Sequence, residues 1–317
     1  AFFLHDTLGF PIDLTKEIAA ISKREVDLEG FEKELEEQST RSRSNRKDQV
    51  VKTSDASDVY KNIFDTKGAT EFVGREFQTI EANVLALIDE SGSQVESLNS
   101  GENGQIILDK TTFYAESGGQ VGDIGTISSD SCEIAVLNTT YAIAPTLVVH
   151  DIKVSSGSVK MNDTVLCAFD VLRRNRIRRN HTATHILHWA LRLVVGDHVK
   201  QAGSLVDDQR LRFDFQHFEQ LTPEQIYEIE ELANQERLKA PNVSHDEMPI
   251  EDAKKMGAIA FFGDKYGEKV RVLTAGPSIE FCGGTHVSNL GFIGSIRIIS
   301  EGSIGSNIRR IEALTGD

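Results

Sequence analysis

The clearest pattern lies between residues 70 and 170, where short apolar runs alternate with turn-forming residues. Gly, Ser and Asn separate the runs, as in SGS at 91–93 and SGENG at 100–104. Short strands with frequent turns are typical of sheets that close on themselves. The pattern predicts a small antiparallel β-barrel, with strands at 81–89, 105–109, 132–138, 146–154 and 165–169.

The chain before the barrel is highly charged and carries apolar residues at helical spacing in 14–21 and 28–35. We therefore expect a helical segment over residues 1–65. Within it, RSRSNRK at 41–47 has no apolar face. This favours a solvated helix end or linker, with an RNA contact as the alternative.

Helical spacing returns beyond residue 170. Residues 182–195 are strongly amphipathic, with Asn180 as the expected N-cap. TPE at 222–224 predicts a second helix that runs to about residue 239. Strands are expected within 203–215, at 270–273 and at 295–300. The fold class is therefore α+β, in three segments: 1–65, 66–170 and 171–317.

Composition limits what this fold can do. The 317 residues carry 34 basic and 49 acidic side chains, and the net charge of −15 argues against sequence-independent binding of nucleic acid. Three cysteines cannot build a disulfide framework in this chain, so we expect reduced thiols and a cytoplasmic location. No apolar run approaches the ~20 residues that span a bilayer. The sequence starts at Ala1 in mid-pattern, so we expect a fragment.

Two separated motifs could together bind a metal ion. His181 and His185 are spaced i, i+4, which places both imidazoles on one face of a helix. Cys282 and His286 flank a glycine turn, CGGTH, that lets a thiolate and an imidazole converge. Nitrogen and sulfur ligands favour zinc, so we expect one zinc ion per chain.

The sequence leaves open whether the zinc ion is structural or catalytic. Metalloprotease pairs carry Glu directly after the first His, but Thr182 follows His181 here. Four protein ligands favour a structural ion, whereas a loosely held ligand or an orienting role would favour catalysis. His188, one turn beyond His185, is expected to lie at the rim of the site.

A glycine-rich loop and several arginines are further candidates. The loop at 112–123, TFYAESGGQVGD, is either a β-turn with glycines at positive φ or a place where a polar ligand approaches bare backbone. Arginines crowd together at 173, 174, 176, 178 and 179, and a glycine-rich turn leads into Arg309 and Arg310. They predict a local basic cleft for phosphate, with salt bridges to the surplus carboxylates as the alternative.

Five motifs together resemble the alanyl-tRNA synthetase family, in its editing portion. They are LHDTLGFPIDLT at 4–15, FYAESGGQVGDIG at 113–125, NHTATHILH at 180–188, FCGGTHV at 281–287 and IRRIEALTG at 308–316. The resemblance covers nearly the whole chain in the order typical of the family. It implies a zinc-containing editing domain of the threonyl/alanyl-tRNA synthetase second-additional-domain type, after the end of a helical tRNA-recognition region.

The resemblance also implies an activity, which is hydrolysis of the ester of serine or glycine wrongly attached to the tRNA for alanine. His181, His185, Cys282 and His286 match the zinc positions of the family, and Gln120 and Arg309 match positions associated with editing. The aminoacylation core, which would bind ATP, and the oligomerisation domain have no counterpart in this sequence. We therefore expect a monomeric fragment whose partner is that tRNA.

These considerations assign roles to single residues. Gln120, Thr182 and Thr184 are candidates for holding the water or the serine hydroxyl. Candidates for contacting the tRNA end are Glu116, Ser117, Gly118, Gly119, Arg176, Arg179, Arg309 and Arg310. An alternative hypothesis is a zinc-stabilised tRNA-binding module without catalysis of its own. A generic zinc hydrolase is disfavoured because Glu does not follow His181.

Overall fold

The computed structural model describes residues 26–27, 30, 53–260 and 267–316. The motif at 4–15 and the basic stretch at 41–47 lie outside these residues. So does most of the predicted helical segment over 1–65, of which the structure describes helix α4 (Thr53–Lys67) at its end. No helix among the described residues is long and apolar enough to cross a membrane.

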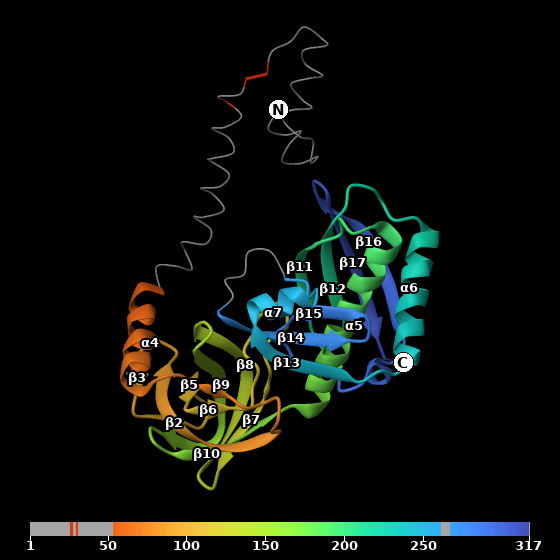
Figure 1. The fold of residues 1–317 in the computed structure, drawn as a ribbon. Coiled ribbons are helices and arrows are strands. Elements are labelled where there is room, and N and C mark those ends of the chain that lie inside the picture. Colours follow the sequence, from red (N-terminus) through yellow and green to blue (C-terminus); the bar gives the residue numbers. More distant parts are fainter. Residues whose placement is uncertain (1–25, 28–29, 31–52, 261–266, 317) are drawn as a thin grey trace.

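Six antiparallel strands form the predicted closed barrel (Figure 1). They follow one another in the order β10-β7-β8-β9-β5-β2, and β10 also pairs with β2, which closes the ring. The strands are β2 (Thr79–Asp89), β5 (Asn103–Leu108), β7 (Gly125–Ser129), β8 (Cys132–Ile143), β9 (Leu147–Lys160) and β10 (Thr164–Phe169). Strand β7, whose sequence is GTISS, was not predicted, because one apolar residue among small polar ones gives no alternation to detect.

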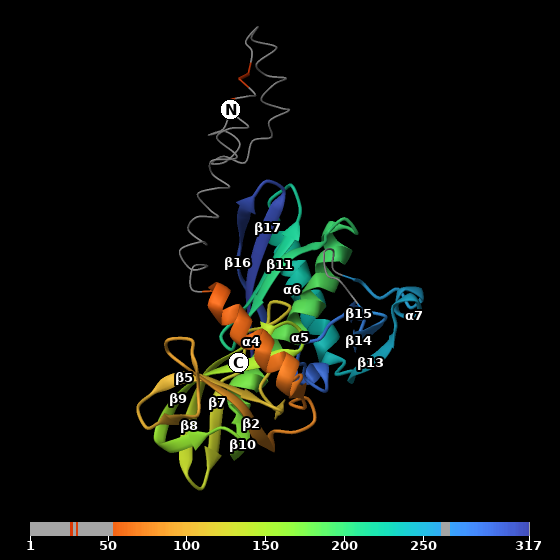
Figure 2. The ribbon, with the colours of Figure 1, turned by 90° about the vertical axis from the view of Figure 1, so that its left-hand side faces the viewer.

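Shorter strands complete this half. β3 (Gln94–Val95) pairs with β2, β4 (Ser97–Asn99) pairs with β9, and β1 (Glu71–Phe72) pairs in parallel with β6 (Lys110–Thr111). Helix α4 lies across the barrel, where Ile63 packs with Ile88 and Ile107 (Figure 2). Burying these side chains stabilises the barrel from outside, in addition to its own interior core.

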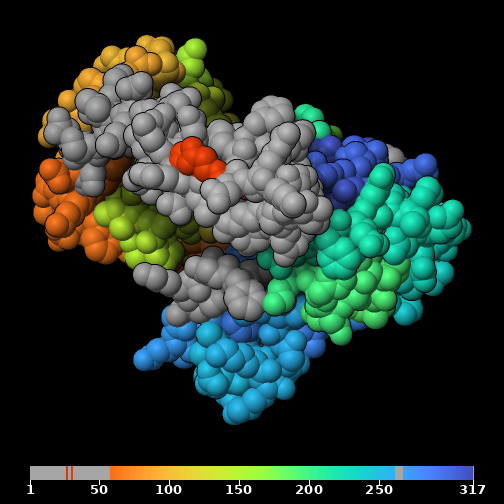
Figure 3. Space-filling model, turned by 90° about the horizontal axis from the view of Figure 1, so that it is seen from above, coloured from red at the N-terminus to blue at the C-terminus, as the bar shows by residue number. Residues whose placement is uncertain are grey.

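The second half contains two sheets. The four-stranded sheet has the order β11-β12-β17-β16, and α5 and α6 pack against it through a shared core. The three-stranded sheet β13-β14-β15 carries α7, whose region projects from one side of the molecule in Figure 3. The elements are α5 (Val171–Val195), β11 (Gln201–Val206), β12 (Leu211–Gln216), α6 (Pro223–Leu238), β13 (Val243–Pro249), α7 (Ile250–Lys255), β14 (Lys269–Ala275), β15 (Ser278–Phe281), η1 (Leu290–Ile293), β16 (Ile296–Gly305) and β17 (Ile308–Thr315).

Helix α6 begins as the sequence predicts. The Thr222 hydroxyl accepts from the Gln225 amide, and the Gln225 side chain accepts in return from the Thr222 amide. Pro223 occupies the first helical turn, where its missing N–H costs no hydrogen bond. This capping box fixes the start of the helix that supports the four-stranded sheet.

Helix α5 begins earlier than the sequence predicts. Its N-cap is Asp170, whose carboxylate accepts from the Arg173 amide, and not Asn180. Asn180 lies inside the helix, donating to the Asp207 carbonyl and accepting from the Thr315 hydroxyl. The arginines at 173–179 therefore form the first turns of the helix instead of preceding it, and two of them bond to the barrel: Arg173 to the Gly122 carbonyl (2.8 Å) and Arg174 to Asp123.

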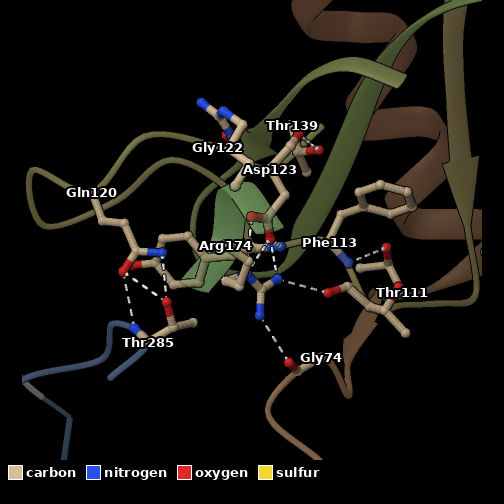
Figure 4. Close-up of polar contacts among 12 residues, drawn as sticks. Gly74, Thr111, Phe113, Gln120, Gly122, Asp123, Thr139, Arg174 and Thr285 are labelled. Carbon is tan, nitrogen blue, oxygen red and sulfur yellow. Dashed lines mark hydrogen bonds and ion pairs between the residues drawn. The ribbon is translucent and has the colours of Figure 1, made fainter. Parts of the chain in front are cut away.

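A buried ion pair joins this helix to the barrel (Figure 4). Arg174 is 0% exposed and forms an ion pair with Asp123, and its Cζ lies over the Phe169 ring, 3.9 Å from the ring centroid. The same guanidinium donates to the carbonyls of Gly74 (2.9 Å) and Thr112 (3.0 Å). Both halves therefore meet around one charge that no water reaches.

We expect Arg174→Met to lower the free energy of unfolding by about 3–5 kcal/mol, because it leaves the Asp123 carboxylate buried without its partner. Arg192→Met, on the same helix, is the matched control. Its partner Asp197 is 92% exposed, so we expect a loss of about 1 kcal/mol or less. Urea unfolding measures both, and equal losses would contradict the assigned role of Arg174.

His150 is a second fully buried polar group, inside the barrel. Its Nδ1 lies 3.0 Å from the Ile106 carbonyl, and its Nε2 lies 2.8 Å from the Thr111 hydroxyl. The Phe113 amide donates to that hydroxyl, which leaves its proton for Nε2. These contacts suit a neutral ring, and burial lowers the pKa of His150 to about 4.

Acid should therefore destabilise the barrel through this residue. In the unfolded chain His150 takes up its proton near pH 6.5, whereas the folded barrel resists protonation down to a pKa of about 4. Its contribution is present above pH 6.5 and is lost as the pH falls towards 4, by on the order of 3 kcal/mol. We expect the stability gap between the protein and His150→Gln to shrink over this range in urea unfolding. A constant gap would refute the assignment.

Candidate metal centre

The structure brings the four expected metal ligands together. His181 and His185 lie on α5, and Cys282 and His286 lie in the turn that follows β15. Their ligand atoms all lie within 4.8 Å of one another, and this group could hold a metal ion. The Cys282 Sγ lies 3.4 Å from His181 Nε2 and 3.2 Å from His286 Nε2. Ligands of one tetrahedral zinc lie roughly 3.3–3.7 Å apart, given bonds of about 2.0–2.3 Å, so the spacing fits.

Each histidine uses its Nδ1 for a partner outside the group. His181 Nδ1 lies 2.8 Å from Gln120 Oε1, His185 Nδ1 lies 2.7 Å from Glu280 Oε2, and His286 Nδ1 lies 3.3 Å from Thr182 Oγ1. Such contacts fix the ring orientation and leave Nε2 for a metal. The Nε2 of His185 is buried and makes no hydrogen bond of normal length to any described residue, which suits a metal ligand.

The electrostatics of the group favour a bound cation. Burial opposes ionisation of the Cys282 thiol, but His181, His286 and His185 outweigh it and hold the pKa of Cys282 well below its usual value. Burial also lowers the pKa of His185, but Glu280 and Cys282 reverse this and raise it to about 10. The buried Cys282 thiolate and Glu280 carboxylate are therefore stabilised by positive charge close to them, which a metal ion would supply.

The CGG turn is fixed by its close packing and by two arginines. A Cβ on Gly284 would overlap the His181 ring, so glycine is required there. Arg271 on β14 donates to the carbonyls of Cys282 (3.0 Å) and Gly284 (2.9 Å). Arg75, from the barrel side, donates to the Gly283 carbonyl (2.6 Å). The two halves of the molecule thus hold the turn that carries two of the ligands.

The glycine loop of the barrel forms a turn that reaches the metal group. Gly118 and Gly119 have φ of 59° and 82°, and Ser117 and Gln120 exchange backbone hydrogen bonds across them. The loop docks on β11, where the Val206 amide donates to the Gly119 carbonyl (2.7 Å). Glu116, Ser117 and Gly118 are exposed beyond this contact.

Gln120 itself is 0% exposed and lies on the Nδ1 side of the His181 ring. Its Oε1 accepts from the Thr285 amide (2.9 Å), and its Nε2 donates to the Thr285 hydroxyl (2.9 Å), as Figure 4 shows. It therefore links the barrel loop to the CGGTH motif and orients His181. Its placement suits a positioning role better than direct contact with a substrate.

Two threonines on α5 differ in their placement. The Thr182 hydroxyl donates to the Arg178 carbonyl (2.8 Å) and accepts from the Val287 amide (3.2 Å), beside His286. The Thr184 hydroxyl donates to the Asn180 carbonyl of its own helix (2.9 Å). Thr182 thus lies at the metal group, whereas no described contact joins Thr184 to it.

His188 does not lie at the rim, as the sequence led us to expect, but is 2% exposed. Its Nδ1 lies 3.0 Å from Glu280 Oε1, so it shares this carboxylate with His185. Spacing alone could not reveal this, because the bridging Glu280 comes from a strand ninety residues further along the chain.

The arginines divide into paired and unpaired groups. Arg173 pairs with Asp208 (3.1 Å), and Arg174 pairs with Asp123. Arg309 binds Glu301 and Arg310 binds Asp214, each through two hydrogen bonds. For these four, the structure favours the salt-bridge alternative. Arg178 and Arg179 instead line a cleft of about 480 Å³ with His286, and Arg176 and Arg179 line a second of about 360 Å³.

Four residues of the site were not predicted: Glu280, Thr285, Arg75 and Arg271. Glu280 and Thr285 stand within or beside the FCGGTHV motif, so their position next to two ligands was the available signal. Arg75 gave no such signal in the sequence, since its contact with Gly283 joins residues more than two hundred positions apart.

Comparison with known families places the chain among aminoacyl-tRNA synthetases. The family described as "tRNA synthetases class II (A)" matches residues 1–173, more than half of the chain. The "Threonyl and Alanyl tRNA synthetase second additional domain" matches residues 270–312, which include Cys282 and His286. The chain thus belongs to the class II synthetases, and the first match includes the barrel.

The similar curated proteins are alanine–tRNA ligases. Alanine–tRNA ligases of Carboxydothermus hydrogenoformans and Alkaliphilus oremlandii are 46% and 47% identical to this chain over 318 and 319 residues. The ligase of Hydrogenovibrio crunogenus is 46% identical over 318 residues. Each match covers 100% of this chain and 36% of the relative. The chain belongs to the alanyl-tRNA synthetase family and spans about a third of the length of these relatives.

Glu280→Gln should weaken metal binding about 10–100-fold, because the charge that holds His185 and raises its basicity is lost. Glu236→Gln is the matched control, a buried glutamate on α6 that pairs with Lys239, and should leave metal affinity unchanged. Competition with a chelator for zinc measures both. Equal affinities of the two variants would rule out the assigned role of Glu280.

Proposed function

We propose that this chain hydrolyses seryl or glycyl esters wrongly formed on the tRNA for alanine, as the editing part of an alanyl-tRNA synthetase. The observation that carries the proposal is the position of the four-ligand group, whose His286 lines a cleft shared with Arg75, Arg178 and Arg179. The family membership and the second-additional-domain match support it. Arginines without ion-pair partners suit the phosphates of an RNA strand, and the adjacent metal ligands suit an ester at the end of that strand.

The proposed reaction is ester hydrolysis. Water adds to the ester carbonyl carbon, and the bond from that carbon to the ribose oxygen breaks. The ribose oxygen takes up one water proton, and the amino acid leaves as a carboxylate after losing the other to solvent. A zinc ion bound by His181, His185, Cys282 and His286 would supply positive charge for orienting the substrate, the role favoured by four protein ligands.

The residues of this chain would act mainly by positioning. Gln120 orients His181, and Thr182 orients His286, through the contacts described above. Among the candidates for contact with the tRNA end, Arg179 lies at the cleft of His286 and Arg176 at the neighbouring cleft. Gly118 and Gly119 serve the turn that carries Gln120, and the exposed Glu116 and Ser117 stand beside it.

Selectivity against the correct alanyl ester would follow from hydrogen bonding. A site that pairs its polar groups with a substrate hydroxyl rejects the analogue without that hydroxyl, because the polar groups are then left unpaired. Serine carries the hydroxyl that alanine lacks. This hydrogen-bonding argument applies to the seryl ester, because glycine, like alanine, has no hydroxyl.

Replacing Cys282 with Ala should abolish tight zinc binding and reduce deacylation of seryl-tRNA at least about 100-fold, since one ligand and its charge are lost. Cys167→Ala, in the barrel core, removes the same thiol away from the site and should retain both properties. Zinc content and release of labelled serine are measured on the same samples, with alanyl-tRNA as the substrate that should remain intact. Unchanged deacylation by Cys282→Ala would contradict the proposal.

One observation favours a second candidate function. All four positions of a tetrahedral site are supplied by the protein, as in structural zinc sites. The chain would then be a zinc-stabilised tRNA-binding module without catalysis of its own. Binding of seryl-tRNA by the zinc-loaded protein without any release of serine would establish this alternative.

A further inference from the structure

The cleft beside His286 has an unusual charge composition for this molecule. It measures about 480 Å³, and its lining residues are Arg75, Asn175, Arg178, Arg179, His286, Val287, Ser288 and Phe292. Three of these are arginines and none is acidic, in a chain whose net charge is −15. This lining carries local positive charge, which suits an anionic ligand.

The three arginines also keep unused hydrogen-bonding capacity. None of them forms an ion pair with a carboxylate of the described residues, whereas Arg173, Arg174, Arg309 and Arg310 all do. The Nε of Arg178 is buried without a hydrogen-bond partner. Arg75 uses one donor on the Gly283 carbonyl. A guanidinium has five donors in a planar fork, so the cleft retains donors suited to phosphate.

An aromatic side chain completes the arrangement. Phe292 lines the same cleft and is 65% exposed, although it follows the buried Leu290 and precedes the buried Ile293. Nucleobases stack on exposed aromatic rings in proteins that bind single-stranded RNA, whatever the base. The combination of cations and one exposed ring therefore suits a nucleotide better than a simple anion.

We propose that this cleft binds one phosphodiester group of a single-stranded RNA end through Arg178, Arg179 and Arg75, with a neighbouring base stacked on Phe292. The inference rests on the proposed function and deepens it, because His286 in the cleft wall places the end of that RNA beside the metal group. It also reconciles RNA binding with the net charge of −15. The positive charge of this cleft is local, whereas the chain as a whole carries a surplus of acidic side chains.

The test uses the full chain loaded with zinc and a stem-loop RNA that carries a short single-stranded 3′ end but no amino acid. Arg178→Met combined with Arg179→Met keeps the aliphatic stems and removes the charges. We expect it to weaken binding about tenfold or more, as lost charged hydrogen bonds should. The slope of log affinity against log salt should fall by about 0.7, the value for one phosphate of a single strand.

Arg297→Met is the control, since it removes a positive charge from an exposed position on β16 outside the cleft. It should leave both affinity and salt slope close to those of the unaltered protein. A blunt-ended stem-loop should bind equally weakly to all these proteins. Equal weakening by the Arg297 variant, or no weakening by the cleft variant with zinc content intact, would overturn the proposal.

The stacking contact is tested separately. Phe292→Ala should weaken binding of the single-stranded end several-fold, and Phe292→Trp should restore it, because any large aromatic ring supports a base. Equal affinity of the Ala and Trp variants would refute the contact. Binding is measured without an ester, so these outcomes are independent of deacylation. Loss of turnover with normal cleft binding would refute only the editing function.

Discussion

The arrangement of the whole molecule depends on the burial of one charge, the guanidinium of Arg174. Without water, this group must be satisfied by the protein, and its partners all come from the barrel: the Asp123 carboxylate and the carbonyls of Gly74 and Thr112. These partners belong to the two barrel loops that also reach the metal group. Arg75, next to Gly74, donates to Gly283, and Gln120, in the other loop, binds Thr285 and His181. One buried ion pair therefore sets the position of both loops.

The metal group shows the same dependence on distant parts of the chain. Two ligands come from α5 and two from the turn after β15, while their orienting partners come from the barrel loop, from β15 and from α5 itself. The turn can approach His181 only because residue 284 is glycine. The site is thus a joint product of both halves, and arginines from both sides hold its turn: Arg75 binds the Gly283 carbonyl, and Arg271 binds those of Cys282 and Gly284.

Sequence patterns could predict what depends on local spacing. The alternating runs predicted the barrel, and the His181–His185 and Cys282–His286 spacings predicted the four ligands. The start of α5 was missed because Asn180 is a good cap in isolation, whereas the residue that caps the helix is Asp170, whose carboxylate accepts from the Arg173 amide. The pairing of Arg309 and Arg310 with Glu301 and Asp214 depends on strand register, which no local pattern reveals.

The central claim is that His181, His185, Cys282 and His286 together bind one zinc ion. X-ray absorption at the zinc edge, on protein loaded with one equivalent of zinc, tests it most directly. The account predicts three nitrogen ligands at about 2.0–2.1 Å and one sulfur ligand at about 2.3 Å, with the sulfur lost in Cys282→Ser. A zinc ion surrounded by nitrogen and oxygen alone in the unaltered protein would contradict it.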